Sequence, residues 1–141
     1  MWLNIEIIVS EYMRILILTF ILLLLLTACN PNPPSVLYYE NLPAGGDVAR
    51  GEELFNTAIN SAPPCSACHI PNSPASPDLA GLAERAASRV EGQEAQEYIF
   101  YSIVEPARYI VDGYGNVMWN QYDESLSAQD IADLISYLLS L

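Results

Sequence analysis

Two cysteines three residues apart, Cys65 and Cys68, are followed directly by His69, the only histidine among 141 residues. This cluster constrains the fold because the domain around it is small: capping signals and apolar periodicity confine it to residues 47–141. A domain of that size buries little apolar surface and commonly needs a metal, a disulfide or a cofactor to fold. These three residues are the ones best suited to hold such a group.

Zinc and redox dithiol chemistry both fit the cluster poorly. A structural zinc site takes four protein ligands, but the chain offers only Cys65, Cys68 and His69, because its third cysteine lies in a lipidation signal. A carboxylate would have to complete the site. A thioredoxin-like dithiol expects a preceding strand and a βαβ arrangement, and the sequence indicates neither.

A disulfide between Cys65 and Cys68 is the plainest alternative for an exported domain. It would close a very short loop, constrain the chain little and leave His69 unexplained. Attachment of haem c accounts for all three residues, because two thiols add across the vinyl groups and the adjacent imidazole reaches the iron. We therefore expect one covalently bound haem c.

The N-terminal segment is typical of a secretory signal. Residues 15–28 are apolar but too few for a comfortable transmembrane helix, which needs about 20. The block ends in LTAC, at Cys29, which resembles a bacterial lipobox; an uncleaved signal anchor is the alternative. Residues 1–12 carry two glutamates and no base, whereas Met13 precedes an arginine. We therefore expect translation to start at Met13 and residues 1–28 to be removed.

Cys29 is then the first mature residue and the site of lipidation. Two or three acyl chains, at about 0.8 kcal/mol per buried methylene, would hold the protein on the extracytoplasmic side of a bacterial membrane. Residues 29–46 are rich in proline and glycine, which predicts a stiff tether of up to roughly 50 Å. Alternatively, residues 36–42 pack on the domain or on a neighbouring subunit.

The chain is strongly acidic, with 17 acidic residues, 5 basic residues and a formal net charge of −12. Such a surface repels phosphate backbones, which argues against nucleic acid as a partner. It favours a partner with a basic docking surface, since opposite fields raise encounter rates. The same acidity also serves solubility.

Apolar periodicity predicts a mainly α domain of four to five short helices, with helices at residues 48–58, 79–89 and 94–104 and after Ser127. Asp47 can cap the first helix, on which Val48, Gly51 and Phe55 share one face. Glycine is costly inside a helix, so Gly51 indicates the close approach of another element.

The last helix has the clearest signals. Ser127 and Asp130 form a capping-box-like pair, and apolar residues then recur at helical spacing, at Ile131, Leu134, Ile135 and Leu138. This helix is expected to bury one apolar stripe against the rest of the domain.

Residues 47–141 resemble a class I monohaem cytochrome c in a bacterial lipoprotein form. ARGEELF resembles its first helix, CSACH its haem motif, PDLAGLA the segment after the motif and LSAQDIADLISYLLSL its last helix. The resemblance implies a small cytochrome c fold wrapped around one haem. It also implies that the first and last helices cross, with Gly51 and Phe55 against the face that carries Tyr137.

The same resemblance implies a haem pocket. The Pro77 carbonyl is expected to face the second nitrogen of His69, while Leu79 and Leu82 pack on the haem. Met118 is the only methionine after residue 28. A lone methionine usually fills a core gap, but the distal ligand of this family lies in such a loop before the last helix, which implies His69 and Met118 as axial ligands.

Three further residues are candidates for the pocket. Trp119 stands where the family often has proline, and it is expected to pack on the haem. Arg89, like Arg85, can pair with a haem propionate or else lie solvated on a helix face.

Iron with two protein ligands passes electrons but does not readily bind a substrate. The resemblance therefore implies electron transfer and no enzymatic activity: a membrane-anchored carrier that passes single electrons between respiratory or photosynthetic redox partners. One alternative is a fixed monohaem subunit of a quinol-oxidising or oxidase complex in the membrane. Another is a peroxidase-like or gas-sensing haem with an open sixth site.

Overall fold

The computed structural model describes residues 12–20 and 37–141, and the chain divides into two units, Met1–Ser35 and Val36–Leu141. Residues 12–20 are helical and exposed. Among the described residues, no helix is long and apolar enough to cross a membrane. The predicted lipidation site Cys29 and most of the predicted signal and tether lie outside the described residues.

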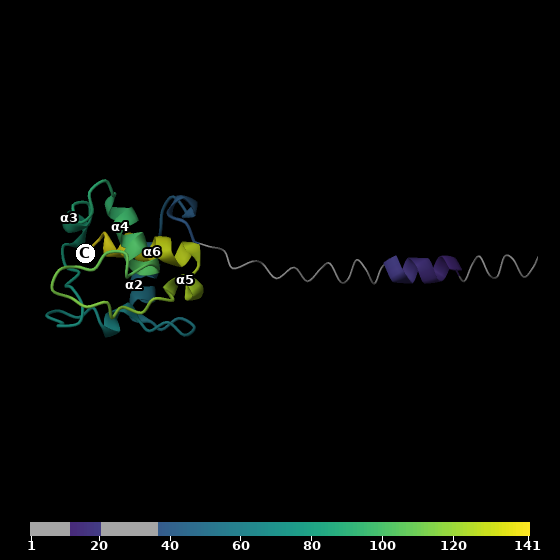
Figure 1. Ribbon diagram of the computed structural model, residues 1–141, viewed down its shortest axis with the longest axis horizontal. Helices are drawn as coiled ribbons and strands as arrows, with labels where there is room; N and C mark the ends of the chain where they lie inside the picture. Colours follow the sequence, from purple (N-terminus) through teal and green to yellow (C-terminus); the bar gives the residue numbers. More distant parts are fainter. Residues whose placement is uncertain (1–11, 21–36) are drawn as a thin grey trace, which may run out of the picture. The chain divides into compact units, whose positions relative to one another are not determined.

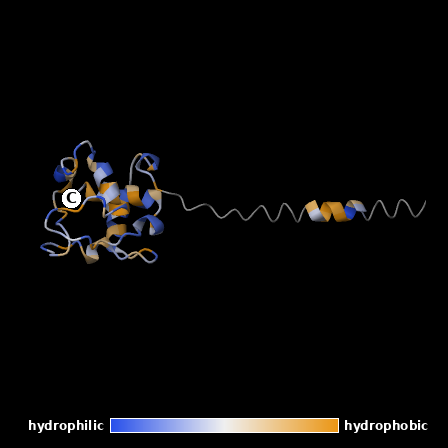
Figure 2. Ribbon diagram, in the orientation of Figure 1, coloured by the Kyte–Doolittle hydropathy of each residue, from blue (hydrophilic) through white to orange (hydrophobic). Residues whose placement is uncertain are grey.

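The second unit is helical, as predicted (Figure 1). Its α-helices are α2 (Val48–Asn56), α3 (Leu82–Ala86), α4 (Ala95–Val104), α5 (Tyr122–Ser125) and α6 (Ala128–Leu138), with 3-10 turns η1 (Tyr39–Asn41) and η2 (Cys65–Ala67). The described residues contain no β-strand, only an isolated bridge between Ile59 and Ala62. Hydrophobic and hydrophilic residues alternate along the helices (Figure 2), as in amphipathic helices that surround a core.

Helices α2 and α6 cross at Gly51, which confirms the prediction of a close approach. A Cβ at Gly51 would lie 2.1 Å from the Asp133 carbonyl oxygen and 2.7 Å from the Tyr137 Cβ. One turn further on, the Phe55 and Tyr137 rings pack with centroids 5.4 Å apart. The absence of a side chain at Gly51 therefore allows the two helices to touch.

Both predicted helix caps are present. The Asp47 carboxylate accepts hydrogen bonds from the backbone N–H groups of Ala49 and Arg50 at 2.8 and 3.2 Å. Ser127 and Asp130 form the reciprocal capping box of α6. The predicted stripe of α6 is buried, with exposed fractions of 7% or less at Ile131, Leu134, Ile135 and Leu138. On α2, however, Val48 is 45% exposed and Leu54 is buried in its place.

The helix predicted at residues 79–89 is shorter than expected. Gly81 has a left-handed φ of 66°, and its N–H donates to the Leu141 carbonyl at 3.0 Å. Before it, the Asp78 side chain accepts from the Ala80 N–H at 2.9 Å, which forms a turn. The chain therefore enters α3 only at Leu82.

Residues 37–46, here called the strap, pack on the domain. The Tyr39 and Phe100 rings lie 5.8 Å apart, the Gly46 N–H donates to the Ser136 hydroxyl at 3.1 Å, and the Asp47 N–H donates to the buried Asp133 carboxylate at 2.8 Å. The strap covers Phe100 on α4, a helix that consequently buries more than the single stripe predicted from its periodicity. The tether predicted at residues 29–46 is therefore not free at its C-terminal end.

Candidate functional site

A cavity of about 320 Å³ lies within the helical unit. It brings together every described residue that the sequence assigned to the site, namely Cys65, Cys68, His69, Pro77, Leu79, Leu82, Arg89, Met118 and Trp119. Arg85 and Tyr114 line it as well. These residues come from η2 and the residues after it, the loop before α3, α3 and the turn that follows it, and the loop between α4 and α5.

The turn η2 holds the two cysteines and the histidine close together. The Cys65 carbonyl accepts from the N–H groups of both Cys68 and His69, at 3.2 and 3.0 Å. Both cysteines are free thiols, and burial raises the pKa of Cys65 to about 11. The Cys65 thiol is therefore protonated at neutral pH, and a thioether formed there adds no buried charge.

His69 is oriented by the loop before α3. Its Nδ1 lies 3.2 Å from the Pro77 carbonyl oxygen, which selects the tautomer with the proton on Nδ1 and leaves Nε2 to bind a metal. Burial lowers the pKa of His69, although the hydrogen bond to Pro77 opposes the shift. The ring is therefore neutral at pH 7, as a metal ligand must be.

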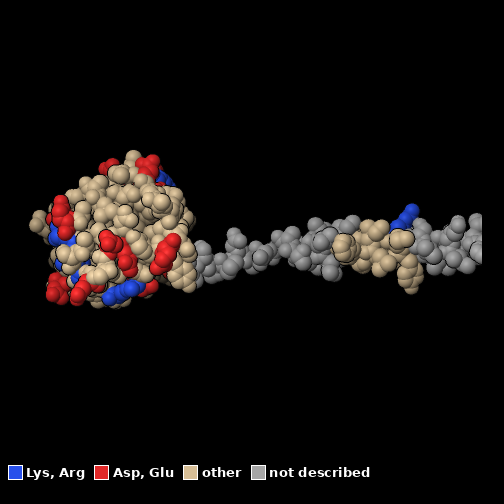
Figure 3. Space-filling model, turned by 90° about the horizontal axis from the view of Figure 1, so that it is seen from above, with Lys and Arg blue, Asp and Glu red and all other residues tan. Residues whose placement is uncertain are grey.

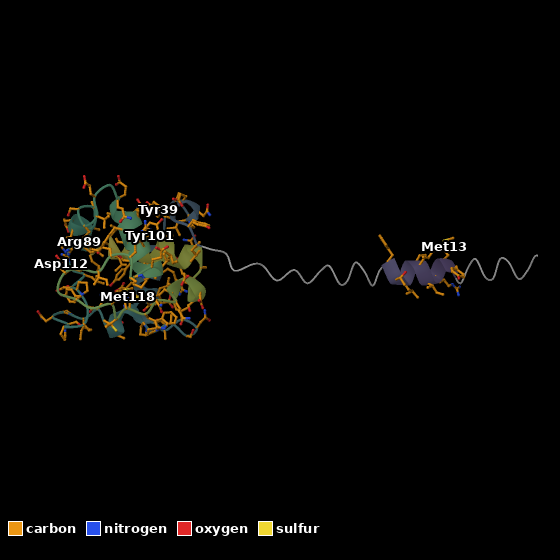
Figure 4. All side chains as sticks on the ribbon, in the orientation of Figure 1. Met13, Tyr39, Arg89, Tyr101, Asp112 and Met118 are labelled. Carbon is orange, nitrogen blue, oxygen red and sulfur yellow. The ribbon has the colours of Figure 1, made fainter. Side chains whose placement is uncertain are left out.

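Met118 lies in the loop between α4 and α5, is half-buried, and packs against the core. Figure 4 labels Met118 and Arg89, which come from separate parts of the helical unit. The neighbouring Trp119 ring meets the Tyr122 ring edge-on at a centroid distance of 4.9 Å. The Tyr122 hydroxyl donates to the Pro63 carbonyl at 3.0 Å, so this loop is linked to the segment that precedes Cys65.

The two arginines of the cavity have different surroundings. Arg85 donates through Nη1 to the Ala80 carbonyl at 2.5 Å and through Nη2 to the Asp78 carbonyl at 2.8 Å. The buried Nε atom of Arg89 has no hydrogen-bond partner among the described residues. A buried donor without a partner is costly, and a carboxylate of a ligand in this cavity would satisfy it.

The donors in the cavity fit haem c. They comprise two free thiols, a neutral imidazole with Nε2 available, a thioether, and a buried guanidinium that lacks an acceptor. In residues 12–20 and 37–141, no group of three or more His, Cys, Asp or Glu residues is arranged so that it could hold a metal ion by itself. Cys65 and Cys68 are not joined as a disulfide.

Sequence reasoning missed part of the cavity wall. Tyr98, Ile99 and Ile103 of α4 line it, although their helical spacing was a usable signal. Tyr109 also lines the cavity, and its ring meets that of Tyr98 at 5.7 Å. No local pattern marks Tyr109, because it lies in a loop and reaches the cavity only through the fold.

Comparison with known proteins places the chain in a family. No curated protein and no solved structure matches it. The family model described as Cytochrome c matches residues 48–141, which include α2, the cysteine and histidine cluster, the Met118 loop and α6. The chain therefore belongs to the cytochrome c family, as a small helical electron-transfer domain with one covalently bound haem c.

Proposed function

We propose that this cytochrome c is an electron carrier anchored by lipid on the extracytoplasmic side of a bacterial membrane, with His69 and Met118 as axial ligands. One observation carries the proposal: a single cavity is lined by both attachment cysteines, by His69 and by Met118. Haem c supplies an iron that cycles between the ferrous and ferric states. The protein passes single electrons between redox partners and is not an enzyme.

The protein contributes the ligands and their orientation. His69 is held by the Pro77 carbonyl, while the neutral, soft thioether of Met118 favours ferrous iron and raises the reduction potential. With His69 and Met118 as its ligands, the iron would have no position left for a substrate. This arrangement suits electron transfer and argues against the peroxidase-like and gas-sensing alternatives.

An optical spectrum of the purified full-length protein at controlled redox potential tests this proposal. We expect low-spin haem in both oxidation states, a sulfur-to-iron charge-transfer band in the ferric state, and no binding of carbon monoxide in the ferrous state. A high-spin resting spectrum would overturn the axial pair and favour an open sixth site.

The lipid anchor at Cys29 is proposed from the sequence LTAC. In a bacterial host, Cys29→Ala should abolish acylation, which leaves the protein either as a soluble extracytoplasmic form or as an unacylated, uncleaved precursor that stays with the membrane through its apolar segment. The wild type should yield an N-terminal peptide that begins at residue 29 and carries the mass of acyl chains. An unmodified Cys29 in the mature protein would contradict the anchor.

The packed strap limits how far the anchored domain can move. If the lipid is on Cys29 and packing begins by Leu37, the intervening chain spans at most roughly 25–30 Å at 3.3–3.6 Å per residue. This short reach also favours the second candidate, a fixed subunit of a quinol-oxidising or oxidase complex. Co-purification with large membrane subunits in mild detergent would support the fixed subunit, whereas isolation as a single chain would support the mobile carrier.

We further propose that the redox partners present basic docking surfaces. Acidic side chains are spread over the face of the domain seen in Figure 3, with few basic ones among them, in keeping with the net charge of −12. Attraction between opposite surfaces is screened by salt. An electron-transfer rate that is independent of ionic strength would contradict this.

A further inference from the structure

The loop before α3 provides the acceptor for His69. Residues 76–81, here called the proximal loop, contain Pro77, whose carbonyl oxygen lies 3.2 Å from His69 Nδ1. This loop contains no helix or strand, so no regular backbone ladder fixes the Pro77 carbonyl. Other contacts must hold the carbonyl in line with the imidazole.

Ser76 holds the start of the proximal loop. Its side chain is buried, with an exposed fraction of 6%, and its hydroxyl donates to the Cys68 carbonyl at 2.5 Å. Cys68 directly precedes His69, and Ser76 directly precedes Pro77. This bond therefore joins the two backbone segments whose separation determines the contact between Pro77 and His69.

Arg85 holds the proximal loop on the C-terminal side of Pro77. Its guanidinium reaches back from α3 and donates to the Asp78 and Ala80 carbonyls at 2.8 and 2.5 Å. Asp78 directly follows Pro77. The fork of the guanidinium can donate to two acceptors at once in a fixed geometry, which the single ammonium of a lysine cannot reproduce.

We propose that Ser76 and Arg85 are positioning residues that set the reduction potential through His69. They fix the Pro77 carbonyl from both sides, and this carbonyl in turn fixes the imidazole and raises its basicity. A more basic imidazole stabilises ferric iron and keeps the potential low. The inference rests on the proposed ligation of iron by His69.

The direction in which the reduction potential changes shows whether Arg85 acts by positioning the Pro77 carbonyl or through its positive charge. Removal of a positive charge near the iron disfavours the electron-rich ferrous state and lowers the potential. Loss of the hydrogen bond between Pro77 and His69 weakens the imidazole as a donor and raises the potential. Arg85→Lys keeps the positive charge but loses the paired hydrogen bonds of the guanidinium. A change in its reduction potential therefore measures the loss of positioning and not the loss of charge.

The experiment compares the holoprotein with Arg85→Lys and Ser76→Ala. Both variants should have a higher reduction potential than the wild type, and the Nδ1–H proton of His69 should exchange with solvent about tenfold faster, as expected for the loss of one hydrogen bond. Two controls should leave both quantities unchanged. Ser73→Ala removes a hydroxyl that accepts from the Ala75 N–H, and Arg50→Lys alters an arginine on α2 that pairs with Glu53.

The outcomes separate this inference from the proposed ligation. In the ferrous wild type, the ring current of the haem should shift the ring protons of an iron-bound His69 strongly. If that shift is absent, His69 does not bind the iron and the proposed axial pair is wrong. If the shift is present but Arg85→Lys keeps the potential and exchange rate of the wild type, the role of Arg85 is overturned; the same result for Ser76→Ala overturns that of Ser76.

Discussion

Met118→Ala should abolish the sulfur-to-iron charge-transfer band of the ferric protein and allow the ferrous protein to bind carbon monoxide. Alanine cannot reach the iron, so the sixth position becomes available to exogenous ligands. The reduction potential should fall by an amount on the order of 0.1 V, within the roughly 0.8 V range that axial ligands span, because the thioether favours ferrous iron. Optical spectra with and without carbon monoxide, together with a redox titration, measure these effects.

Val117→Ala is the matched control for this substitution. Val117 is the neighbouring residue in the same loop, lines the same cavity and is 69% exposed. Its substitution also shortens a side chain of this loop to alanine but removes no ligand, so the charge-transfer band and the lack of reaction with carbon monoxide should persist. If Met118→Ala also kept the band, another residue would have to be the distal ligand.

Gly51→Ala should destabilise the fold by about 2 kcal/mol. The new Cβ would lie 2.1 Å from the Asp133 carbonyl oxygen, a backbone atom in the middle of α6, so the helices would have to move apart. Such overpacking typically costs 1–3 kcal/mol and occasionally more. The gain of roughly 1 kcal/mol in helix propensity offsets only part of this cost. Denaturant unfolding of the holoprotein, followed by far-UV circular dichroism, measures the change.

Gly45→Ala is the control for Gly51→Ala. A Cβ at Gly45 meets no atom within 4 Å, so this substitution should change the unfolding free energy by less than about 0.5 kcal/mol. Equal stability of the two variants would show that α2 and α6 do not meet in the close contact described here.

The sequence predicted much of the fold because the relevant signals are local. Asp47 and the Ser127–Asp130 pair are helix caps, whose geometry depends on the adjoining few residues. Non-local packing explains the errors. Val48 continues an apolar face but lies at the exposed start of α2. For the strap the sequence left two possibilities, a free tether or packing on the domain, and the contact of Tyr39 with Phe100 on α4 shows the packing. Which side chain in a distant segment becomes the partner cannot be recognised from neighbouring residues.

The sequence by itself determined the chemistry of this protein: two thiols beside an imidazole, and one methionine in the segment before the last helix. Covalent attachment depends on residue types at short spacing, which a sequence states directly. Only the tertiary structure decided which side chains share the cavity and how the two arginines differ. Arg85 and Arg89 lie four residues apart and look alike in the sequence. Yet Arg85 meets the carbonyls of Asp78 and Ala80, while the Nε atom of Arg89 is buried without a partner in the described structure, because hydrogen-bond partners depend on how distant segments are brought together.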